Sequence, residues 1–342
     1  MDNNSQLNIK GKNILIIGNR SYKNMGDELI LLWTVKLLLQ QNKKIIISCY
    51  DPQWLQSFFS QFLDLSSITF IHEIPKGIRS TFQWLKEGWL KELKYFWITD
   101  TVILWWGEII TEENPSAYWY RLVGMWPFLL RKCFSFKRKT RSLYVMWWIQ
   151  IPQSRWKKRL FTSLLNRVTH LYLRDFQAVE EIKNFWYLNT DFFMDTSYFS
   201  YERSNIKKEK EHEKYIIVNL NKNGEKFIDE VVQDVEKYVE KWYSVYYVPV
   251  AKGQNTYYND IQYKEKLEQL FSGNSKKSLE IQVLDRESDF QYFIKMVKNA
   301  EIVISTRLHL FLVASFLGTM TKVYPYQRKI LKMQEVINAI ID

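Results

Sequence analysis

The sequence is poor in cysteine and lacks a long hydrophobic run. Its two cysteines, Cys49 and Cys133, have neither a CxxC nor a Cys/His spacing, so we expect no zinc site and unpaired thiols in a reducing compartment. The apolar run at 143–151 is far shorter than the roughly 20 residues that cross a bilayer. Residues 1–6 are polar and form no apolar signal core. We therefore expect a soluble cytoplasmic protein that could also lie at the inner face of the cell membrane.

Glycine is rare in the chain, whereas tryptophan is common. There are 11 glycines and 14 tryptophans, although glycine alone usually makes up about 7% of residues. Several tryptophans stand at loops and helix ends, where glycine is favoured because it tolerates close backbone approach and positive φ. They are Trp105, Trp106, Trp147, Trp148, Trp186 and Trp242. We hypothesise that these are glycines whose UGA codons were read under the wrong genetic code; the alternative is an unusually aromatic protein.

The chain is basic, with 48 Lys and Arg against 37 Asp and Glu and a formal net charge of +11. This balance favours anionic partners such as phosphorylated metabolites, nucleic acid or an acidic membrane surface. No nucleic-acid motif with stacked aromatics is present, so we expect no nucleic-acid partner. At most, we expect a peripheral contact with a membrane.

Strands alternate with helices along the chain, which is typical of βαβ units and parallel sheets. The alternation stops at a highly charged stretch, 201–214, and then restarts. The predicted fold is α/β, with two Rossmann-like domains whose parallel sheets face a central cleft, as in GT-B enzymes. We expect an N-terminal domain at 1–200 and a C-terminal domain at 201–342, whose last helix is a candidate to pack back on the first domain. The expected strands are 12–18, 44–49, 101–104, 142–146, 170–173, 215–218, 245–250, 279–284, 302–305 and 321–324. The expected helices are 27–41, 85–96, 118–134, 154–169, 176–185, 227–242, 261–271, 290–298, 308–317 and one that begins near 327.

A short apolar strand at 302–305 ends beside Arg307 and His309. Ligands of open α/β sheets bind outside the carboxyl ends of the strands, where these two residues would lie. Arginine can bind phosphate or carboxylate in a bidentate manner, and histidine can move a proton near neutral pH. The alternative is a surface arginine and a half-buried histidine at the start of a helix.

A polar loop after the first strand contains Asn24, Gly26, Asp27 and Glu28. Asp27 could cap the following helix, whose free N–H groups and dipole attract phosphate or carboxylate. The loop is not a GxGxxG motif, so a plain dinucleotide-binding fold is not indicated.

Five short sequence features follow one another along nearly the whole chain. They are the Asn-x-Gly-Asp-Glu loop at 24–28, Gly107-Glu108 after the strand at 101–104, Arg174-Asp175 followed by Asp195, Arg307-x-His309, and an aromatic-basic segment with Tyr324, Tyr326 and Lys329. With these features the chain resembles the polysaccharide pyruvyl transferase family. It departs from the family at 105–107, where Trp-Trp-Gly replaces a Gly-Gly-Gly turn.

The resemblance implies a transferase that moves the pyruvyl (carboxyvinyl) group of phosphoenolpyruvate onto sugar hydroxyls of a cell-surface glycan and forms a ketal. It implies roles in exopolysaccharide and cell-wall biosynthesis and a glycan acceptor, with a lipid-linked form left open; no metal or other cofactor is expected. His309 is then the acid/base residue, and Arg307, Arg174 and Lys329 bind the donor anions. The other implied substrate-binding residues are Asn24, Gly26, Asp27, Glu28, Gly107, Glu108 and Tyr326. Of these, Glu28 and Glu108 are candidate hydroxyl bases. Asp175 and Asp195 are expected to be structural.

Two other functions fit the same pattern. One is a GT-B-type glycosyltransferase that uses a nucleotide sugar, because it would also have two Rossmann-like halves and a basic cleft. The other is a non-catalytic homologue that binds a sugar phosphate. Release of phosphate from phosphoenolpyruvate, release of nucleotide from a nucleotide sugar, or binding without turnover would distinguish the three.

Overall fold

The protein is described from a computed structural model. The residues described are 7–18, 24–73, 85–87, 92, 94–110, 142–149, 154–155, 158–159, 162, 168–173, 176–184, 189–193, 214–252, 259–274, 281–284 and 290–341. The chain divides into two compact units: unit 1 contains Met1–Ser21 and Leu31–Thr196, and unit 2 contains Tyr22–Ile30 and Ser197–Asp342. Helix α1, Met25–Gln40, therefore has its first residues in unit 2 and the rest in unit 1.

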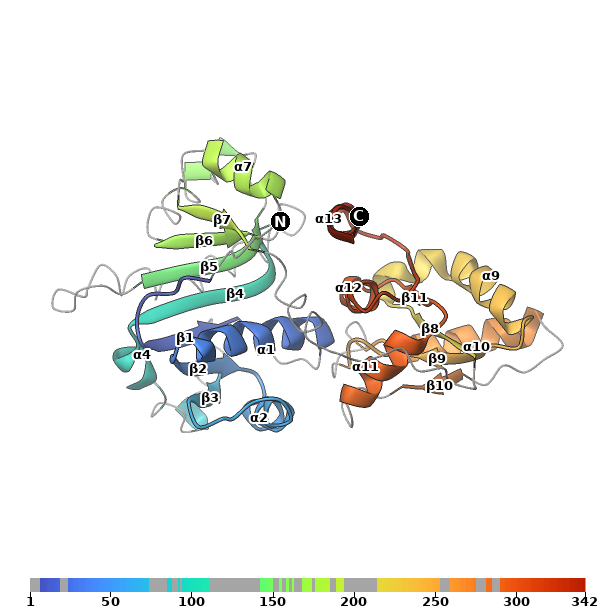
Figure 1. Cartoon of the computed structure of the whole chain (residues 1–342), viewed down its shortest axis with the longest axis horizontal. Coiled ribbons are helices and arrows are strands. Elements are labelled where there is room, and N and C mark those ends of the chain that lie inside the picture. Colours follow the sequence, from blue (N-terminus) through green and yellow to red (C-terminus); the bar gives the residue numbers. More distant parts are fainter. Residues whose placement is uncertain are drawn as a thin grey trace. The chain divides into compact units, whose positions relative to one another are not determined.

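Unit 1 contains a seven-stranded parallel sheet in the order β3-β2-β1-β4-β5-β6-β7 (Figure 1). The strands are β1 Asn13–Ile17, β2 Lys44–Cys49, β3 Ile68–His72, β4 Thr101–Ile110, β5 Ser142–Ile149, β6 His170–Leu173 and β7 Thr190–Phe192. Besides α1, the helices that the structure describes from end to end are α2 Pro52–Ser60, α4 Lys94–Ile98 and α7 Phe176–Asn184. Strand β1 has four consecutive buried aliphatic residues, the pattern of a parallel strand that is covered on both faces.

The fourth and fifth strands run further than the sequence predicted. The expected strand 101–104 continues through Trp105 and Trp106 to Ile110, and the expected strand 142–146 continues through Trp147 and Trp148. The predicted end of the fourth strand at residue 104 is therefore wrong. Tryptophan is favoured in strands and glycine is depleted, so this sequence extends the sheet where a glycine turn would end it. The pairing of β4 with β5 is nevertheless irregular on both sides of Glu108.

Other boundaries also differ from expectation. Of the helix predicted at 85–96, residues 85–86 and 94–96 are helical, the last three within α4, while 88–91 and 93 lie outside the described residues. The sequence did not indicate α2, β3 or β7. The predicted helix at 118–134, most of the helix predicted at 154–169, and Trp186 lie outside the described residues, as does nearly all of the charged stretch at 201–214. Among the described residues, no helix is both long enough and apolar enough to cross a lipid bilayer.

Unit 2 contains a five-stranded parallel sheet in the order β10-β9-β8-β11-β12 (Figure 1). The strands are β8 Tyr215–Asn219, β9 Ser244–Tyr247, β10 Ile281–Val283, β11 Val303–Ser305 and β12 Thr321–Val323. The helices are η2 Lys222–Phe227, α9 Ile228–Val239, α10 Gln262–Asn274, α11 Phe290–Asn299, α12 Leu308–Phe316 and α13 Arg328–Ile341. The chain moves from β8 outward to β10 and returns to β11 on the other side. The two neighbouring strands β8 and β11 thus form the topological switch point of this sheet, where ligands of open α/β sheets bind.

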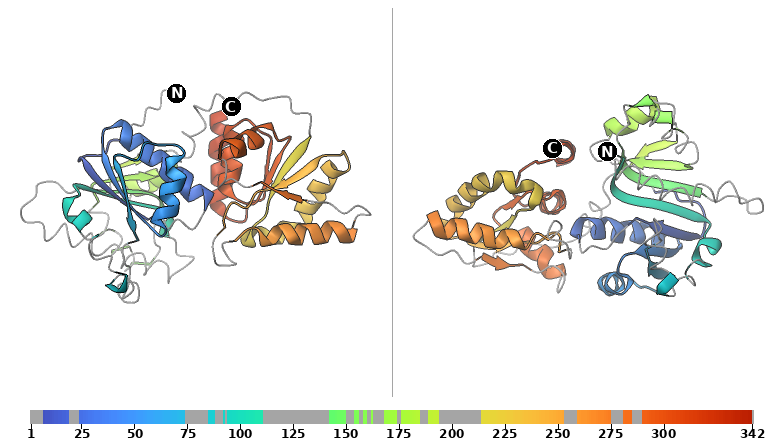
Figure 2. Two further views of the ribbon diagram at one scale, coloured as in Figure 1. Left: turned by 90° about the horizontal axis from the view of Figure 1, so that it is seen from below. Right: turned by 180° about the vertical axis from the view of Figure 1, so that it is seen from behind.

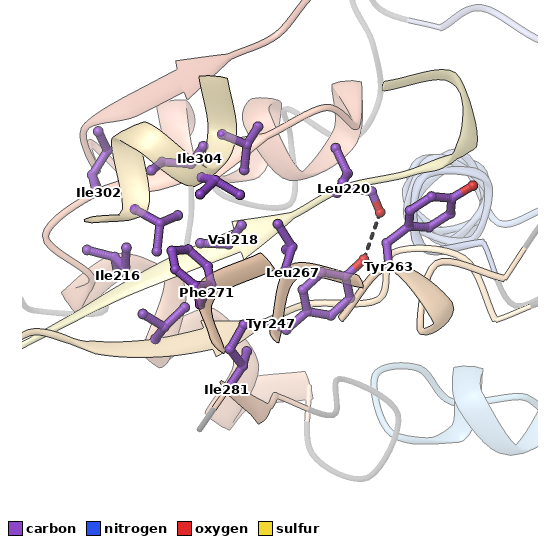
Figure 3. Packing of buried hydrophobic residues seen from close by; sticks show 14 of the residues in the cluster. Ile216, Val218, Leu220, Tyr247, Tyr263, Leu267, Phe271, Ile281, Ile302 and Ile304 are labelled. Atoms are coloured by element: carbon purple, nitrogen blue, oxygen red, sulfur yellow. Dashed lines mark hydrogen bonds between the residues drawn. The ribbon is translucent and has the colours of Figure 1, made fainter. Parts of the chain in front are cut away.

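Two apolar clusters stabilise unit 2. In the first, Ile216 and Val218 of β8 and Ile304 of β11 pack with Tyr247 and Phe271, as Figure 3 shows. The second cluster joins two helices that lie against each other (Figure 2). It consists of Leu308, Phe311 and Leu312 of α12 and Ile330, Met333 and Ile337 of α13. Helix α12, whose first residues flank the switch point, is therefore buried on more than one side.

Three helix ends in the described residues share one backbone motif. Asn42, Trp242 and Gly318 have φ of 55°, 65° and 75°. In each case the residue's N–H bonds the carbonyl three residues back, and the next N–H bonds the carbonyl five residues back. This is the Schellman motif, whose left-handed position strongly favours glycine and accepts asparagine. The prediction that Trp242 occupies such a position is confirmed, and the residue is 81% exposed.

Replacing Trp242 by glycine is expected to raise the free energy of unfolding by about 1 kcal/mol. A non-glycine residue in the left-handed region costs about 1–2 kcal/mol, part of which is offset by the greater chain entropy of glycine. Urea unfolding would measure the difference, with Asn42→Gly as the control that should gain less, because asparagine already tolerates the conformation. An unchanged or lower stability, or a UGG codon at position 242 in the gene, would argue against a misread glycine there.

Candidate active site

The switch point of unit 2 is lined by polar residues that follow β8 and β11. Asn219 ends β8 opposite Ser305 of β11. Beyond the strands, Thr306 N–H donates to the Asn219 carbonyl (3.2 Å), and the Thr306 hydroxyl accepts from Asn221 N–H (3.0 Å). The two strand ends are thus hydrogen-bonded together directly before Arg307 and α12.

Arg307 is held by a buried carboxylate of the same unit. Its Nε donates to Oδ2 of Asp260 (3.1 Å) and its Nη2 to Oδ1 (2.6 Å). Burial acts to lower the pKa of Arg307, but the charge and hydrogen bonds of Asp260 raise it above its ordinary value. The guanidinium therefore stays charged. It has five N–H donors, and Asp260 uses only one edge of it.

Asp260 is a site residue that the sequence did not indicate. An aspartate shortly before a helix, here α10, is the ordinary pattern of an N-cap, and nothing in the spacing links it to Arg307. The carboxylate is 1% exposed and also accepts from Asn219 Nδ2 (3.3 Å) and Ala251 N–H (3.2 Å). Its backbone carbonyl accepts from the Tyr247 hydroxyl (2.7 Å), whose pKa burial raises well above the ordinary value.

The Asn24–Glu28 segment belongs to the same unit as Arg307 and His309. Met25 N–H donates to the Val250 carbonyl (3.0 Å), and Asn24 forms an antiparallel bridge with Ala251. Asn24 also fixes the first turn of α1, because its Oδ1 accepts from Gly26 N–H (3.2 Å) and its Nδ2 donates to Asp27 (3.1 Å). Glu28 is fully buried in the same turn.

Gly26 lies directly against the imidazole of His309. A Cβ atom at position 26 would fall 1.8 Å from His309 Nδ1 and 2.2 Å from its Cγ, so no larger residue fits without a shift. The close approach brings the Asn24–Glu28 motif and the Arg307-x-His309 motif together. His309, in the first turn of α12, is half-buried beside the start of α1.

A family model for polysaccharide pyruvyl transferases matches residues 24–321, which include both motifs. The chain belongs to the polysaccharide pyruvyl transferase family. The resemblance seen in the sequence is therefore confirmed. None of the curated proteins matches the chain.

Several solved structures share the fold of this pyruvyl transferase family member. A putative UDP-N-acetylglucosamine 2-epimerase from Listeria monocytogenes is 10% identical with a TM-score of 0.54, covering 98% of this chain and 89% of that one. UDP-GlcNAc 2-epimerase from Neisseria meningitidis, bound to UDP-GlcNAc, is 11% identical with a TM-score of 0.53, covering 96% and 90%. Anabaena Alr3699/HepE, in complex with UDP and glucose, is 11% identical with a TM-score of 0.51, covering 97% and 90%. At this identity the likeness shows the fold alone, and it confirms the predicted GT-B-like α/β architecture.

The remaining predicted site residues are spread over both units. Tyr326 follows β12, and its hydroxyl accepts from Asn221 Nδ2 (3.3 Å). Lys329 lies in the first turn of α13. Gly107 and Glu108 lie within β4 of unit 1. Arg174, Asp175 and Asp195 lie outside the described residues. Unit 2 alone thus brings together the Asn24–Glu28 segment, Arg307, His309 and Tyr326.

Proposed function

We propose that the protein transfers the pyruvyl group of phosphoenolpyruvate onto two hydroxyls of a sugar in a cell-surface glycan, and so forms a ketal. The observation that carries this proposal is the packing of His309 on Gly26 beside the charged Arg307 in one unit. The transfer needs a group that moves protons and cations that bind the phosphate and carboxylate of the donor. We place the reaction in the cytoplasm, with the inner membrane face as the place where a lipid-linked acceptor would be met.

The reaction can be assigned to residues step by step. His309 protonates the methylene carbon of phosphoenolpyruvate, and a sugar hydroxyl attacks the adjacent carbon. The phosphate then leaves as its C–O bond breaks, and a second hydroxyl closes the ketal. Arg307, Arg174 and Lys329 bind the donor anions, and the positive end of the α1 dipole at Asn24–Asp27 favours phosphate. Glu28 or Glu108 accepts a hydroxyl proton, while Gly107 and Tyr326 contact substrate.

The test is to supply phosphoenolpyruvate and glycan acceptors and to measure phosphate release together with the mass of the product. Phosphate release that depends on the acceptor, with a ketal-bearing product, is the expected result. Nucleotide release from a UDP- or GDP-sugar would show a glycosyltransferase instead. Binding of phosphoenolpyruvate without turnover of either donor would show a non-catalytic homologue.

Arg307→Lys is expected to raise the KM for phosphoenolpyruvate about 10-fold or more. Lysine has one point of charge and cannot hold Asp260 with one edge while it offers a second edge to an anion. Steady-state kinetics with the donor varied would measure the change, and the KM for the acceptor, which should stay constant, is the internal control. An unchanged donor KM would leave Arg307 as a purely structural partner of Asp260.

A further inference from the structure

We propose that Asp260 is a positioning residue for the donor site, and this inference rests on the proposed function. Asp260 fixes the guanidinium of Arg307 in the one orientation that turns its free N–H groups toward phosphoenolpyruvate. The two hydrogen bonds, at 2.6 and 3.1 Å, engage both carboxylate oxygens and so restrain the position and the plane of the guanidinium.

The carboxylate is itself rigidly held, which is what allows it to set the position of Arg307. It receives hydrogen bonds from Asn219 at the end of β8 and from Ala251 after β9. The backbone of Asp260 is also bonded on both sides, to the Ala251 carbonyl (2.8 Å) and to the Tyr247 hydroxyl (2.7 Å). Arg307 thus takes its orientation from two neighbouring strands of the sheet and not from its own flexible side chain.

The segment that holds Asp260 also holds the start of α1. Ala251 bonds the carboxylate of Asp260 and pairs with Asn24, and the preceding Val250 accepts from Met25. Gly26, the next residue, is the one on which His309 packs. One short segment, 250–251, therefore sets both Arg307, through Asp260, and His309, through Gly26.

A second buried carboxylate in unit 2 provides a matched control. Asp234 is 6% exposed and accepts hydrogen bonds from Tyr324, Lys322 and Lys237, the last at 2.9 Å. Burial acts to raise the pKa of Asp234, but these hydrogen bonds lower it below its usual value, so it is also a charged, paired carboxylate. It lies on α9 and does not contact Arg307, so its loss should affect stability and not the donor site.

The experiment compares Asp260→Asn, Asp260→Glu and Asp234→Asn in the full-length protein. We expect Asp260→Asn to raise the donor KM about 10- to 100-fold, because the guanidinium of Arg307 loses its charged partner. The acceptor KM should stay unchanged. Asp260→Glu keeps the charge but moves it by one methylene, so it should fold more stably than the asparagine variant and still raise the donor KM. Asp234→Asn should lower the unfolding midpoint without changing the donor KM.

Two results would overturn the inference. A wild-type donor KM in Asp260→Glu would do so even if the asparagine variant failed to fold. A donor KM that rises equally in Asp234→Asn would show a general loss of stability. The proposed function fails separately: it fails if the wild-type protein neither binds phosphoenolpyruvate in a thermal-shift titration nor releases phosphate from it.

Discussion

His309→Ala is expected to lower kcat for pyruvyl transfer by about 10²- to 10⁴-fold, the usual contribution of a positioned acid/base group. The side chain lies at the switch point of unit 2, where its imidazole packs on Gly26 and occupies the space that a Cβ atom at position 26 would need. Alanine removes the proton carrier and leaves Arg307 and Asp260 in place. The donor KM should therefore change much less than kcat. Single-turnover phosphate release would separate the effect on the chemical step from the effect on donor binding.

The control is His170→Ala, which removes another partly buried histidine. His170 begins β6 in unit 1, and its Nε2 lies 2.9 Å from Asp191. Burial lowers the pKa of His170 below its ordinary value, which is the behaviour of a structural histidine that stays neutral near pH 7. Its loss should reduce stability and leave kcat unchanged. A His309→Ala enzyme with near-wild-type turnover would remove His309 from the mechanism.

The fold could be predicted from the sequence because its signals are local. Runs such as Ile14–Ile17 and Ile45–Cys49 are buried strands whose apolar character is visible in a short window. The boundaries were wrong at Trp105 and Trp147, where strand-favouring residues stand just beyond the expected strand ends at 104 and 146. At these positions the strand propensity of tryptophan opposes the small-residue loop of the family pattern, and the strands continue through them.

The site could be predicted only in its parts. Arg307 was expected to bind a carboxylate or phosphate, and it does bind a carboxylate, but one from Asp260 of the same unit. A pair that is 47 residues apart in sequence leaves no periodic signal, because tertiary packing alone brings the two side chains together. The same holds for Gly26: the motif was visible, but the reason for glycine was not, because no positive φ is required there and the constraint is the ring of His309.

Gly26→Ala is expected to reduce transfer about 100-fold and to lower the free energy of unfolding by about 1–3 kcal/mol. The added methyl would lie 1.8 Å from His309 Nδ1, so either the imidazole or the start of α1 must move. Displacement of a reacting group by about 1 Å is enough for a rate loss of this size, and overpacking of a buried contact has a cost of this order. Kinetics and urea unfolding of the same preparations would measure both effects.

Gly318→Ala is the matched control for Gly26→Ala. Gly318 has φ of 75°, and no atom beyond its two chain neighbours lies within 4 Å of the point that a Cβ would occupy, so alanine there is strained but meets no other residue. It should therefore lose stability through its backbone alone and keep full activity. If both alanine variants lost activity to the same extent, the loss would come from instability and not from the contact with His309.

A double-mutant cycle isolates the contact itself. In a His309→Ala background the ring is absent, so Gly26→Ala should have little effect on stability, and the two substitutions should be non-additive by about 0.5–3 kcal/mol. Additive effects would show that the methyl at position 26 clashes with some other group. Non-additivity in stability, together with the loss of kcat in each single variant, would mean that Gly26 is required because the catalytic imidazole occupies the space of its missing side chain.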